Sequence, residues 1–481
     1  MNTDGTQTQC LRIRAHHFPN LREYALDGVR LHFDESWGYT MAFARAHDAV
    51  LEAIVSDPAR RVRVEAGLDD ICECGVCPNR KPHCAAPALA ETDRRAAARF
   101  GGVVGQEYAA QDLVALATRP VLDLGEVDLK SGERMKVRLV SPPAPEYAER
   151  LGHFLAHKPD WAVRKIRKQL NGDYGKECVD KFFVGEIDGR LAGHVWYGYA
   201  VAGSGTANFG EVYTAPEHRR KGVADELIRF LVEDFHASPA RLALCTAGEV
   251  ATRIYAKHGF RTVVPDANRG PLILPKRRFG NSFAESADAY YRPGQPVSVV
   301  PGSIKHRHDI DCMLRFTHIL RRGTDAESRL RGVGFTGASL ADRVGPAWHV
   351  PNYMDACFQV DDGRGFLTIA ALPEGRAAGW AFVLRRESPL EAGSYTFDFE
   401  LHPTYLAAAP QLIRDTLEMA TTKGITDIFA WCAASPSAKT EVLTANGFAE
   451  TARVPGYCRG GDGAACDMVV MRSSHPAPRI G

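Results

Sequence analysis

The chain has 481 residues, which exceeds one ordinary domain and accommodates three of typical size. Its 59 basic and 58 acidic side chains leave a formal net charge of +1, which argues against a nucleic-acid or anionic membrane partner. The polar first residues carry no signal pattern, no apolar run reaches membrane-spanning length, and 12 cysteines in so long a chain do not form a disulfide scaffold. We therefore expect a cytoplasmic protein.

Residues 1–125 are expected to form a first, small α/β domain. Residues 11–14 and 62–65 have the pattern of short strands. Three segments carry apolar residues at helical spacing, at 40–55, 91–100 and 109–118. A polar stretch from Asp128 to Arg134 then marks a domain boundary.

A cluster of cysteines distinguishes this first domain. Four of them lie close together, at Cys72, Cys74, Cys77 and Cys84. Gly75 and Pro78 supply the turns that would let one loop bring the four thiolates together. Four sulfur ligands suit zinc or an iron–sulfur cluster, and so dense a group is costly to leave unligated. We therefore predict a metal site, with scattered buried cysteines as the alternative.

Residues 11–120 resemble a small bacterial and archaeal domain family of unknown function that is suspected to hold an iron–sulfur cluster. The resemblance is carried by the cysteine run and by Arg12-Ile-Arg14-Ala-His16-His17 upstream of it. That family tends to have a cysteine just after the histidine pair, where this chain has Asn20, and Cys74 would replace that ligand. His16 and His17 are further candidate ligands, or they orient the loop. The resemblance favours iron and sulfur over zinc.

A second domain is expected over residues 135–265. Its predicted order is strand, two helices, a hairpin that turns at Asp188-Gly189, strand, loop, helix, strand and helix. The helix after the loop carries apolar residues from Leu227 to Phe235. The other elements are predicted at 137–140, 145–156, 162–170, 181–187, 191–200, 208–214, 241–247 and 251–257.

The loop within residues 211–224 carries the strongest chemical signal. The strand ends before Pro216, and Arg219-x-x-Gly222-x-Ala224 opens the following helix. A turn of small residues at a helix start leaves backbone N–H groups without partners, and such groups bind anions. Basic neighbours and the lack of bulk at Gly222 and Ala224 would let a pyrophosphate approach the backbone. The loop therefore predicts a phosphorylated cofactor.

This loop resembles the acetyl-CoA loop of the GNAT acetyltransferase superfamily, whose signature is [Gln/Arg]-x-x-Gly-x-[Gly/Ala] after a strand. A second motif follows in the right order, in which Tyr255 stands four residues before Gly259-Phe260. The resemblance implies a catalytic GNAT domain that binds acetyl-CoA. The cofactor-binding residues that it implies are Val212, Tyr213, Thr214, Arg219, Arg220, Lys221, Gly222, Val223 and Ala224.

Two residues are candidates for catalysis. Tyr255 has the position where many GNAT enzymes carry a phenol that hydrogen-bonds or protonates the coenzyme sulfur, and the alternative is a half-buried packing tyrosine. Glu211 lies beside the loop and is the best placed carboxylate for a general base, with a solvated strand glutamate as the alternative. His194 is a weaker candidate, because a lone histidine is more often structural.

Two features leave details of binding open. The second motif usually starts with an asparagine seven residues before the tyrosine, whereas this chain has Gly248, which removes one hydrogen bond on the cofactor side. Nothing in the sequence names the acyl acceptor. The basic residues between Trp161 and Lys168 point weakly to an anionic or carboxylate-bearing acceptor, although such a face is usually just solvated.

Residues 297–472 resemble a second, degenerate GNAT-like copy, joined to the first by a linker at 266–296. Where the phosphate loop would lie, residues 404–410 contain neither a glycine nor a basic residue, so this copy is not expected to bind coenzyme. Residues 473–481 are expected to be a disordered tail. The elements of the copy are predicted at 297–300, 308–318, 365–372, 378–385, 395–403, 412–419, 425–431 and 438–448.

The predicted fold class is thus α/β (α+β), with tandem GNAT folds around mixed central sheets behind a small cysteine-rich metal-binding domain. The predicted function is an acetyl-CoA-dependent N-acyltransferase that acts on a small-molecule amine, with an accessory iron–sulfur or zinc domain. The alternative is a redox- or iron-responsive binding or regulatory protein whose GNAT folds only bind ligands. In a third possibility the cluster itself takes part in chemistry, which ligation by three cysteines would indicate.

Overall fold

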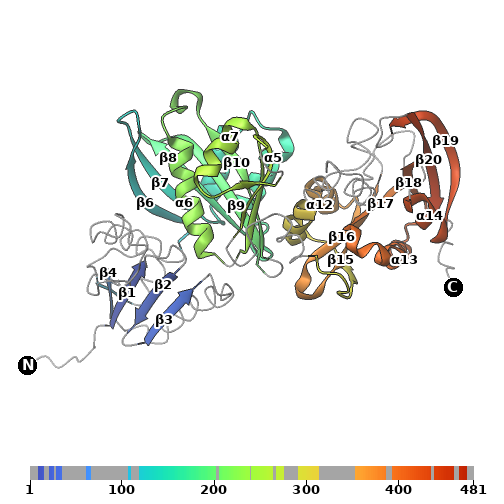
Figure 1. The fold of residues 1–481 in the computed structure, drawn as a ribbon, viewed down its shortest axis with the longest axis horizontal. Coiled ribbons are helices and arrows are strands. Elements are labelled where there is room, and N and C mark those ends of the chain that lie inside the picture. Colours follow the sequence, from blue (N-terminus) through green and yellow to red (C-terminus); the bar gives the residue numbers. More distant parts are fainter. Residues whose placement is uncertain are drawn as a thin grey trace, which may run out of the picture. The chain divides into compact units, whose positions relative to one another are not determined.

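The computed structural model describes most of the chain beyond residue 118 and five short segments before it (Figure 1). His16, His17 and the four cysteines predicted to bind metal lie outside the described residues. The chain divides into two compact units, one mainly within Met1–Asn281 and one mainly within Ser282–Gly481. The described residues are 9–15, 21–26, 29–34, 61–66, 107–109, 119–201, 205–238, 240–263, 267–275, 291–313, 353–385, 393–434, 438–459 and 465–473.

The N-terminal strands form a five-stranded sheet with the order β3-β2-β1-β4-β5. The strands are β1 (Gln9–Ala15), β2 (Leu21–Leu26), β3 (Val29–Asp34), β4 (Arg61–Ala66) and β5 (Glu107–Ala109). The strands predicted at 11–14 and 62–65 are therefore confirmed. The helices predicted at 40–55 and 91–100 lie outside the described residues, and the one at 109–118 is described only at Ala109, which ends β5.

The central part of the chain forms an eight-stranded sheet with the order β12-β13-β11-β10-β9-β8-β7-β6 (Figure 1). The order of elements predicted from 137 to 257 is confirmed. The elements are β6 (Val121–Asp128), β7 (Arg134–Val140), α4 (Pro145–Phe154), α5 (Asp160–Asn171), β8 (Cys178–Ile187), β9 (Arg190–Ala200), β10 (Thr206–Thr214), the short 3-10 helix η4 (Pro216–His218), α6 (Val223–Ala237), β11 (Leu242–Ala247), α7 (Glu249–Lys257), β12 (Arg261–Thr262) and β13 (Gly270–Pro275).

This sheet begins earlier and ends later than the sequence predicted. β6 pairs antiparallel with β7, so the polar residues taken as a domain boundary form the turn of a hairpin. β13 pairs with β11 inside the segment at 266–296, so its assignment to a linker is wrong for 270–275. In both cases the strand is anchored by buried leucines, Leu122 and Leu124 in β6 and Leu272 and Leu274 in β13. Burial alternates at the start of β6, whereas three consecutive residues of β13 are buried, and the polar turns beside both strands resemble linkers in the sequence.

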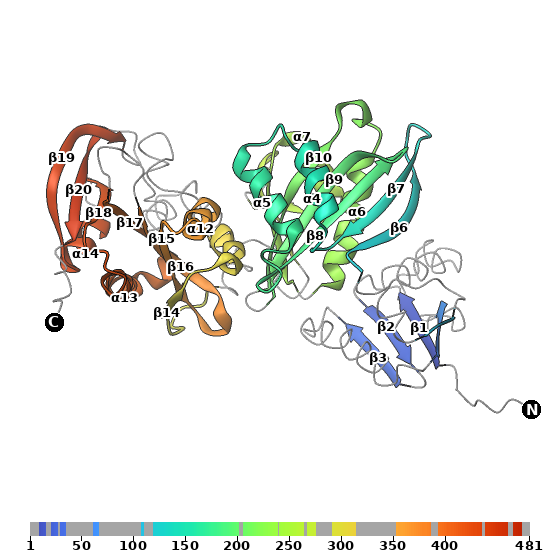
Figure 2. The ribbon, with the colours of Figure 1, turned by 180° about the vertical axis from the view of Figure 1, so that it is seen from behind.

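Helices cover both faces of the central sheet (Figure 2). In β8, Phe182 and Val184 pack with α4 and α5, whereas Phe183 packs with α6 and α7. Neighbouring residues of a strand point to opposite faces, so one strand contributes to two cores. Each such fully buried side chain stabilises the fold by roughly 1.5–3 kcal/mol. The two helix pairs thereby hold the loop after β10 between rigid elements.

The C-terminal unit contains a seven-stranded sheet with the order β14-β15-β16-β17-β18-β20-β19. Seven strands of the central sheet have the same arrangement, in which the strands lie in chain order except that the last two are exchanged. They are β7-β8-β9-β10-β11-β13-β12. The elements are β14 (Ser298–Pro301), α12 (Tyr353–Asp361), β15 (Gly365–Ala371), β16 (Ala377–Arg385), β17 (Tyr395–Leu401), the 3-10 helix η9 (Pro403–Ala408), α13 (Ala409–Thr422), β18 (Ile428–Ala433), α14 (Ala438–Ala445), β19 (Phe448–Arg459) and β20 (Ala465–Ser473).

The elements predicted for this unit are found with shifted ends. The helix predicted at 308–318 is described only to residue 313, where residues 307–313 are helical. Ser473, the first residue of the predicted tail, is the last residue of β20. No helix within the described ranges is long and apolar enough to cross a membrane.

Candidate active site

The loop between β10 and α6 leaves the backbone open at the helix start. Gly222 has a φ of 97° and Arg220 a φ of 64°, so two residues in the left-handed region turn the chain sharply. The first turn of α6 is closed by a hydrogen bond from Glu226 N to Gly222 O (3.0 Å). The N–H groups from Gly222 to Asp225 precede it and have no acceptor within the helix. They are the groups that an anion can use.

The turn between β6 and β7 lies against this loop. Lys130 N donates to Lys221 O (3.2 Å), and Lys221 Nζ lies 2.8 Å from Glu133 Oε2. His218 Nδ1 lies 3.7 Å from the other carboxylate oxygen of Glu133. A Cβ built on Gly222 would meet the side chain of Lys130 at 3.8 Å and no backbone atom within 4 Å. The turn therefore fixes Lys221 and leaves the space over Gly222 free of backbone.

A β-bulge in β10 sets Glu211 apart from its strand. The register with β9 shifts between Gly210 and Tyr213, and Glu211 has a φ of 55°. His194 of β9 supports the bulge, since its Nδ1 lies 3.0 Å from Glu211 O and its ring stacks on Phe182. His194 is fully buried, and burial lowers its pKa to about 4, so it is neutral at physiological pH. These contacts favour the structural interpretation of His194.

Glu211 is held by two lysines rather than solvated. Lys165 Nζ lies 2.6 Å from Glu211 Oε1, and Lys158 Nζ lies 3.6 Å from Oε2. The side chain of Glu211 is 12% exposed. Burial pushes the pKa of the Glu211 carboxyl upward, but the two ammonium groups outweigh it and leave the pKa below its ordinary value. Glu211 is therefore ionised at neutral pH.

Aromatic side chains surround this ion pair. Lys165 Nζ lies 5.0 Å from the centre of the Trp196 ring and 5.7 Å from that of Trp161, within the range of cation–π attraction. Trp161 is 40% exposed, which is unusual for so large an apolar side chain. Tyr213 of β10 packs against the ring of His157 at 4.0 Å. The pair thus lies beside surfaces that suit the apolar part of a small ligand.

Tyr255 lies on α7 in the core behind the loop. Its ring packs edge-on against Phe209 at 5.0 Å and lies 5.7 Å from Phe260, and the residue is 6% exposed. Burial raises the pKa of the phenol above its ordinary value, and the neighbouring Cys245 adds to the shift. No hydrogen bond of its hydroxyl to another described residue is found. Tyr255 therefore packs as its alternative interpretation expects, and it also keeps its proton.

A contact between α6 and α7 fixes Tyr255 relative to the loop. His258, which follows α7, has its Nε2 2.8 Å from Oδ1 of Asp225 in the first turn of α6. Asp225 is thereby engaged beside the helix start, where it would otherwise compete with a bound anion. The end of α7 and the start of α6 are thus held together.

The remaining predicted residues divide into two groups. Val223 is buried, and Val212 packs partly buried against the same core, so these two contribute backbone rather than side chains. Arg219 Nε donates to Thr214 O (3.2 Å), and its guanidinium lies over the ring of Tyr213. Arg220 is exposed. The structure therefore brings the predicted loop residues together, with Glu211 in the same strand as Thr214.

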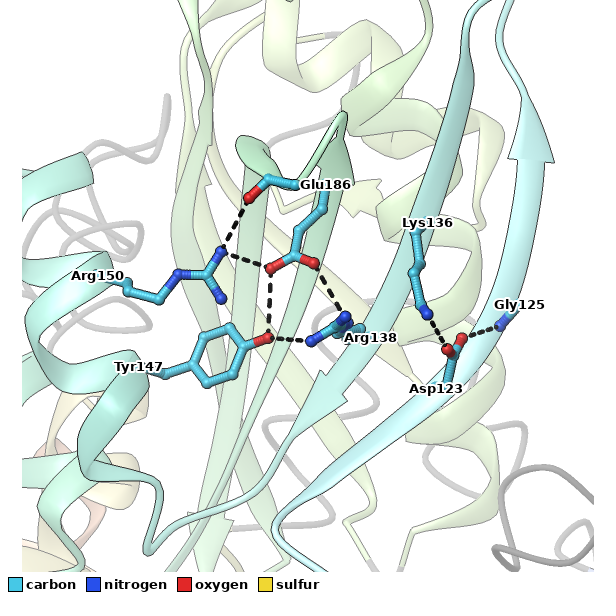
Figure 3. Close-up of polar contacts among 8 residues, drawn as sticks. Asp123, Gly125, Lys136, Arg138, Tyr147, Arg150 and Glu186 are labelled. Atoms are coloured by element: carbon cyan, nitrogen blue, oxygen red, sulfur yellow. Dashed lines mark hydrogen bonds and ion pairs between the residues drawn. The ribbon is translucent and has the colours of Figure 1, made fainter.

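A cluster of charged residues around the buried carboxylate of Glu186 was not predicted from the sequence (Figure 3). Glu186 of β8 is 5% exposed and lies 2.7 Å from Arg150 Nη2 of α4 and 3.2 Å from Arg138 Nε of β7. The hydroxyl of Tyr147 donates to the same carboxylate at 3.3 Å. The cluster ties α4 to two strands, and its members are too far apart in sequence to form a motif. Among the described residues, no group of three or more histidine, cysteine or acidic side chains could hold a metal ion.

Two family models match parts of the chain. Residues 179–262 match the model described as "Acetyltransferase (GNAT) domain". Residues 38–128 match the model described as "Protein of unknown function (DUF1284)". The GNAT resemblance predicted for the central domain is thereby confirmed over residues 179–262, and the stretch with the four cysteines is similar to a family whose description names no activity. A search of curated proteins found no match.

Several solved structures are similar to the chain at low sequence identity. The phosphinothricin acetyltransferase from Sinorhizobium meliloti, solved with AcCoA, is 14% identical, with 38% of this chain and 94% of that chain covered and a TM-score of 0.28. The ribosomal-protein-alanine N-acetyltransferase from Brucella melitensis is 14% identical, with 37% and 98% covered and a TM-score of 0.26. An acetyltransferase of the GNAT family from Streptococcus pneumoniae is 11% identical, with 37% and 99% covered and a TM-score of 0.28.

Proposed function

We propose that this protein, a GNAT-type N-acetyltransferase, transfers the acetyl group of acetyl-CoA to a small-molecule amine. The observation that carries the proposal is the start of α6, where N–H groups without helical acceptors follow Gly222 and its left-handed turn. Glu211 lies in β10, which leads into this loop, and Tyr255 lies on α7, whose end contacts the start of α6 through His258 and Asp225. An anion-binding helix start, a carboxylate and a phenol are the groups that acyl transfer needs.

In this proposal residues 219–224 hold the pyrophosphate of the coenzyme. The N–H groups from Gly222 to Asp225 donate to phosphate oxygens, and the positive end of α6 favours the anion. Arg219 and Arg220 add positive charge, whereas Lys221 is already paired with Glu133. When bound, acetyl-CoA supplies the thioester whose carbonyl carbon the amine attacks.

Glu211 accepts a proton from the attacking amine, directly or through water, as the C–N bond forms and the C–S bond breaks. Tyr255 donates a hydrogen bond to the departing thiolate. Because burial raises the pKa of this phenol, complete proton transfer from it is disfavoured, and the thiolate takes its proton from solvent. Tyr255 thus stabilises the negative charge that develops on sulfur.

Titration calorimetry with acetyl-CoA tests the assignment of the loop. The Arg219→Glu, Gly222→Glu double variant should lose binding without unfolding, because two carboxylates would occupy the space of the pyrophosphate. The exposed Arg190 provides a control, and Arg190→Glu should bind as the wild type does. Unchanged affinity in a folded double variant would rule out the loop as the coenzyme site.

The cysteine run between Cys72 and Cys84 is the basis of a second proposal, an accessory metal site. We propose that Cys72, Cys74, Cys77 and Cys84 hold an iron–sulfur cluster or zinc, which would make the domain structural or redox-responsive. Anaerobic protein should contain iron with a visible absorption shoulder, or stoichiometric zinc without colour. Single Cys→Ser changes at these positions should release the metal and destabilise the first domain. Protein with neither metal would end this proposal and leave the acetyltransferase proposal intact.

The C-terminal unit is proposed to be a GNAT-like copy that does not bind coenzyme. The shared strand order supports the copy. After β17 the chain forms η9 and α13 with no glycine at the junction, and the hydroxyl of Tyr405 in η9 donates to Arg292 O (2.7 Å). A segment preceding β14 therefore contacts the turn where the loop would lie. Equilibrium dialysis should give one acetyl-CoA per chain.

A further inference from the structure

We propose that Lys165 and Lys158 bind an anionic group of the acyl acceptor, and that this binding releases Glu211 to act as the base. The substrate class is then an amine that carries a carboxylate or a phosphate. The inference rests on the proposed function and names the acceptor that its site would select.

Charge balance around the β10 bulge points to an anion. Two ammonium groups share the single carboxylate of Glu211, at 2.6 Å from Lys165 and 3.6 Å from Lys158. In the described part of the chain neither lysine pairs with a second carboxylate. The side chains of Lys165 and Lys158 are 10% and 29% exposed, so water screens the two charges only in part. One surplus positive charge in such a place is best neutralised by a bound anion.

The surroundings of the pair suit a small organic ligand rather than a free ion. Trp161 and Trp196 lie near Lys165. Tyr213 lies on the strand that carries Glu211, and the ring of His157 packs against it. Trp196 is buried, so the exposed ring of Trp161 and the half-buried ring of Tyr213 are the surfaces that would contact the apolar stem of a molecule whose anionic group binds the lysines. The exposed part of Trp161 provides contact area at the surface.

The pair also holds Glu211 in a state that is a weak base. The groups that face its carboxylate are Lys165 of α5 and Lys158 just before α5, and His194 of β9 lies against its backbone carbonyl. Burial alone would raise the pKa of Glu211, and the lysines hold it below its ordinary value. An acceptor carboxylate that engages the ammonium groups weakens their hold and lets the pKa of Glu211 rise. An amine without an anion leaves the ion pair intact.

Matched acceptors test the proposal. The probes are the twenty common amino acids, their α-amides and aminoalkylphosphonates, each with acetyl-CoA and the full-length protein, with thiol release and acetylated product measured. Wild-type kcat/KM should be roughly tenfold to a hundredfold higher for an acid than for its amide, the range expected when a charged partner is lost. The carboxylate and phosphonate arms distinguish the two anions.

Variants of α5 complete the test. Lys165→Met should bring the acid-to-amide ratio close to one, Lys165→Arg should restore most of it, and the control Lys168→Met, which alters a lysine paired with Asp173, should keep it. Acetyl-CoA affinity, measured in parallel, should be unchanged in all three. Amides that react as well as acids, or a preference that survives Lys165→Met, would overturn the proposal. So would tight acetyl-CoA binding without acetylation of any anionic amine, whereas failure to bind acetyl-CoA would instead refute the proposed function.

Discussion

Gly193 of β9 lies directly under Val223, the first residue of α6, so that a methyl group on Gly193 would clash with Val223 Cγ1. Gly193→Ala should therefore displace the start of α6, where the anion-binding N–H groups lie. We expect acetyl-CoA affinity to fall by roughly tenfold, since overpacking costs about 1–3 kcal/mol, part of which would act on the loop. Calorimetry measures the loss.

Gly210 of β10 provides the matched control for this substitution. A Cβ built on Gly210 meets nothing within 4 Å. Gly210→Ala should bind acetyl-CoA with wild-type affinity. Equal affinities for the two alanine variants would show that the start of α6 tolerates displacement and does not set coenzyme affinity.

Tyr255→Phe should lower kcat without weakening acetyl-CoA binding. The phenylalanine keeps the ring contacts with Phe209 and Phe260, so only the hydroxyl is lost. A hydrogen bond to the leaving sulfur acts mainly in the transition state, and its loss should reduce kcat by roughly tenfold to a thousandfold. Steady-state kinetics and calorimetry separate the two effects. An unchanged kcat would make Tyr255 a packing residue.

Lys165→Met should move the acidic limb of the kcat/KM pH profile toward higher pH. Glu211 must be ionised to accept a proton, so activity falls as pH drops through the pKa of its carboxyl. Burial has the largest effect on this pKa and raises it, and among the groups that lower it Lys165 has the largest effect. Removing the ammonium therefore raises the pKa and shifts the limb upward. If the acidic limb does not shift, it reports the titration of a group other than Glu211. Glu211→Gln checks the assignment, because this variant should lose the limb.

His194→Asn should reduce the loss of stability in acid. Burial lowers the pKa of His194 to about 4 from an ordinary value near 6.5. Between these two pH values the histidine is protonated in the unfolded chain and neutral in the native state. The stability that depends on neutral His194 is present above pH 6.5 and is lost as pH falls toward 4, on the order of 3 kcal/mol in all. Chemical unfolding at pH 7 and pH 4.5 measures the difference. The exposed His153 is the control, and His153→Asn should leave the acid sensitivity unchanged.

Local pattern predicted the parts of the site that lie within one stretch of chain. The small-residue turn at Gly222 and the helix after it were predicted from the sequence pattern at a helix start, and the position of Tyr255 on a helix was predicted from its distance to Gly259-Phe260. The left-handed φ of Gly222 was not predicted. Helix periodicity likewise located α4, α5 and α6 to within a few residues.

Contacts between distant segments could not be predicted in this way. Lys165 and Glu211 are 46 residues apart, and Lys221 and Glu133 are 88 apart. Each pair depends on how helices and hairpins pack, which no short motif encodes. The basic residues of α5 were visible in the sequence, but nothing there separated Lys165, which pairs with Glu211, from Lys168, which pairs with Asp173.

The hairpin of β6 and β7 has a consequence for how this protein can be divided. The stretch matched to the N-terminal family runs to residue 128, yet its last eight residues are a strand of the acetyltransferase sheet. A fragment starting at Met135 would expose the open edge of β7 to pairing with other chains and would lose Glu133, the partner of Lys221. The boundary of the N-terminal sequence family at residue 128 therefore differs from the boundary of the central sheet, which begins at Val121. A shortened enzyme should begin before Val121.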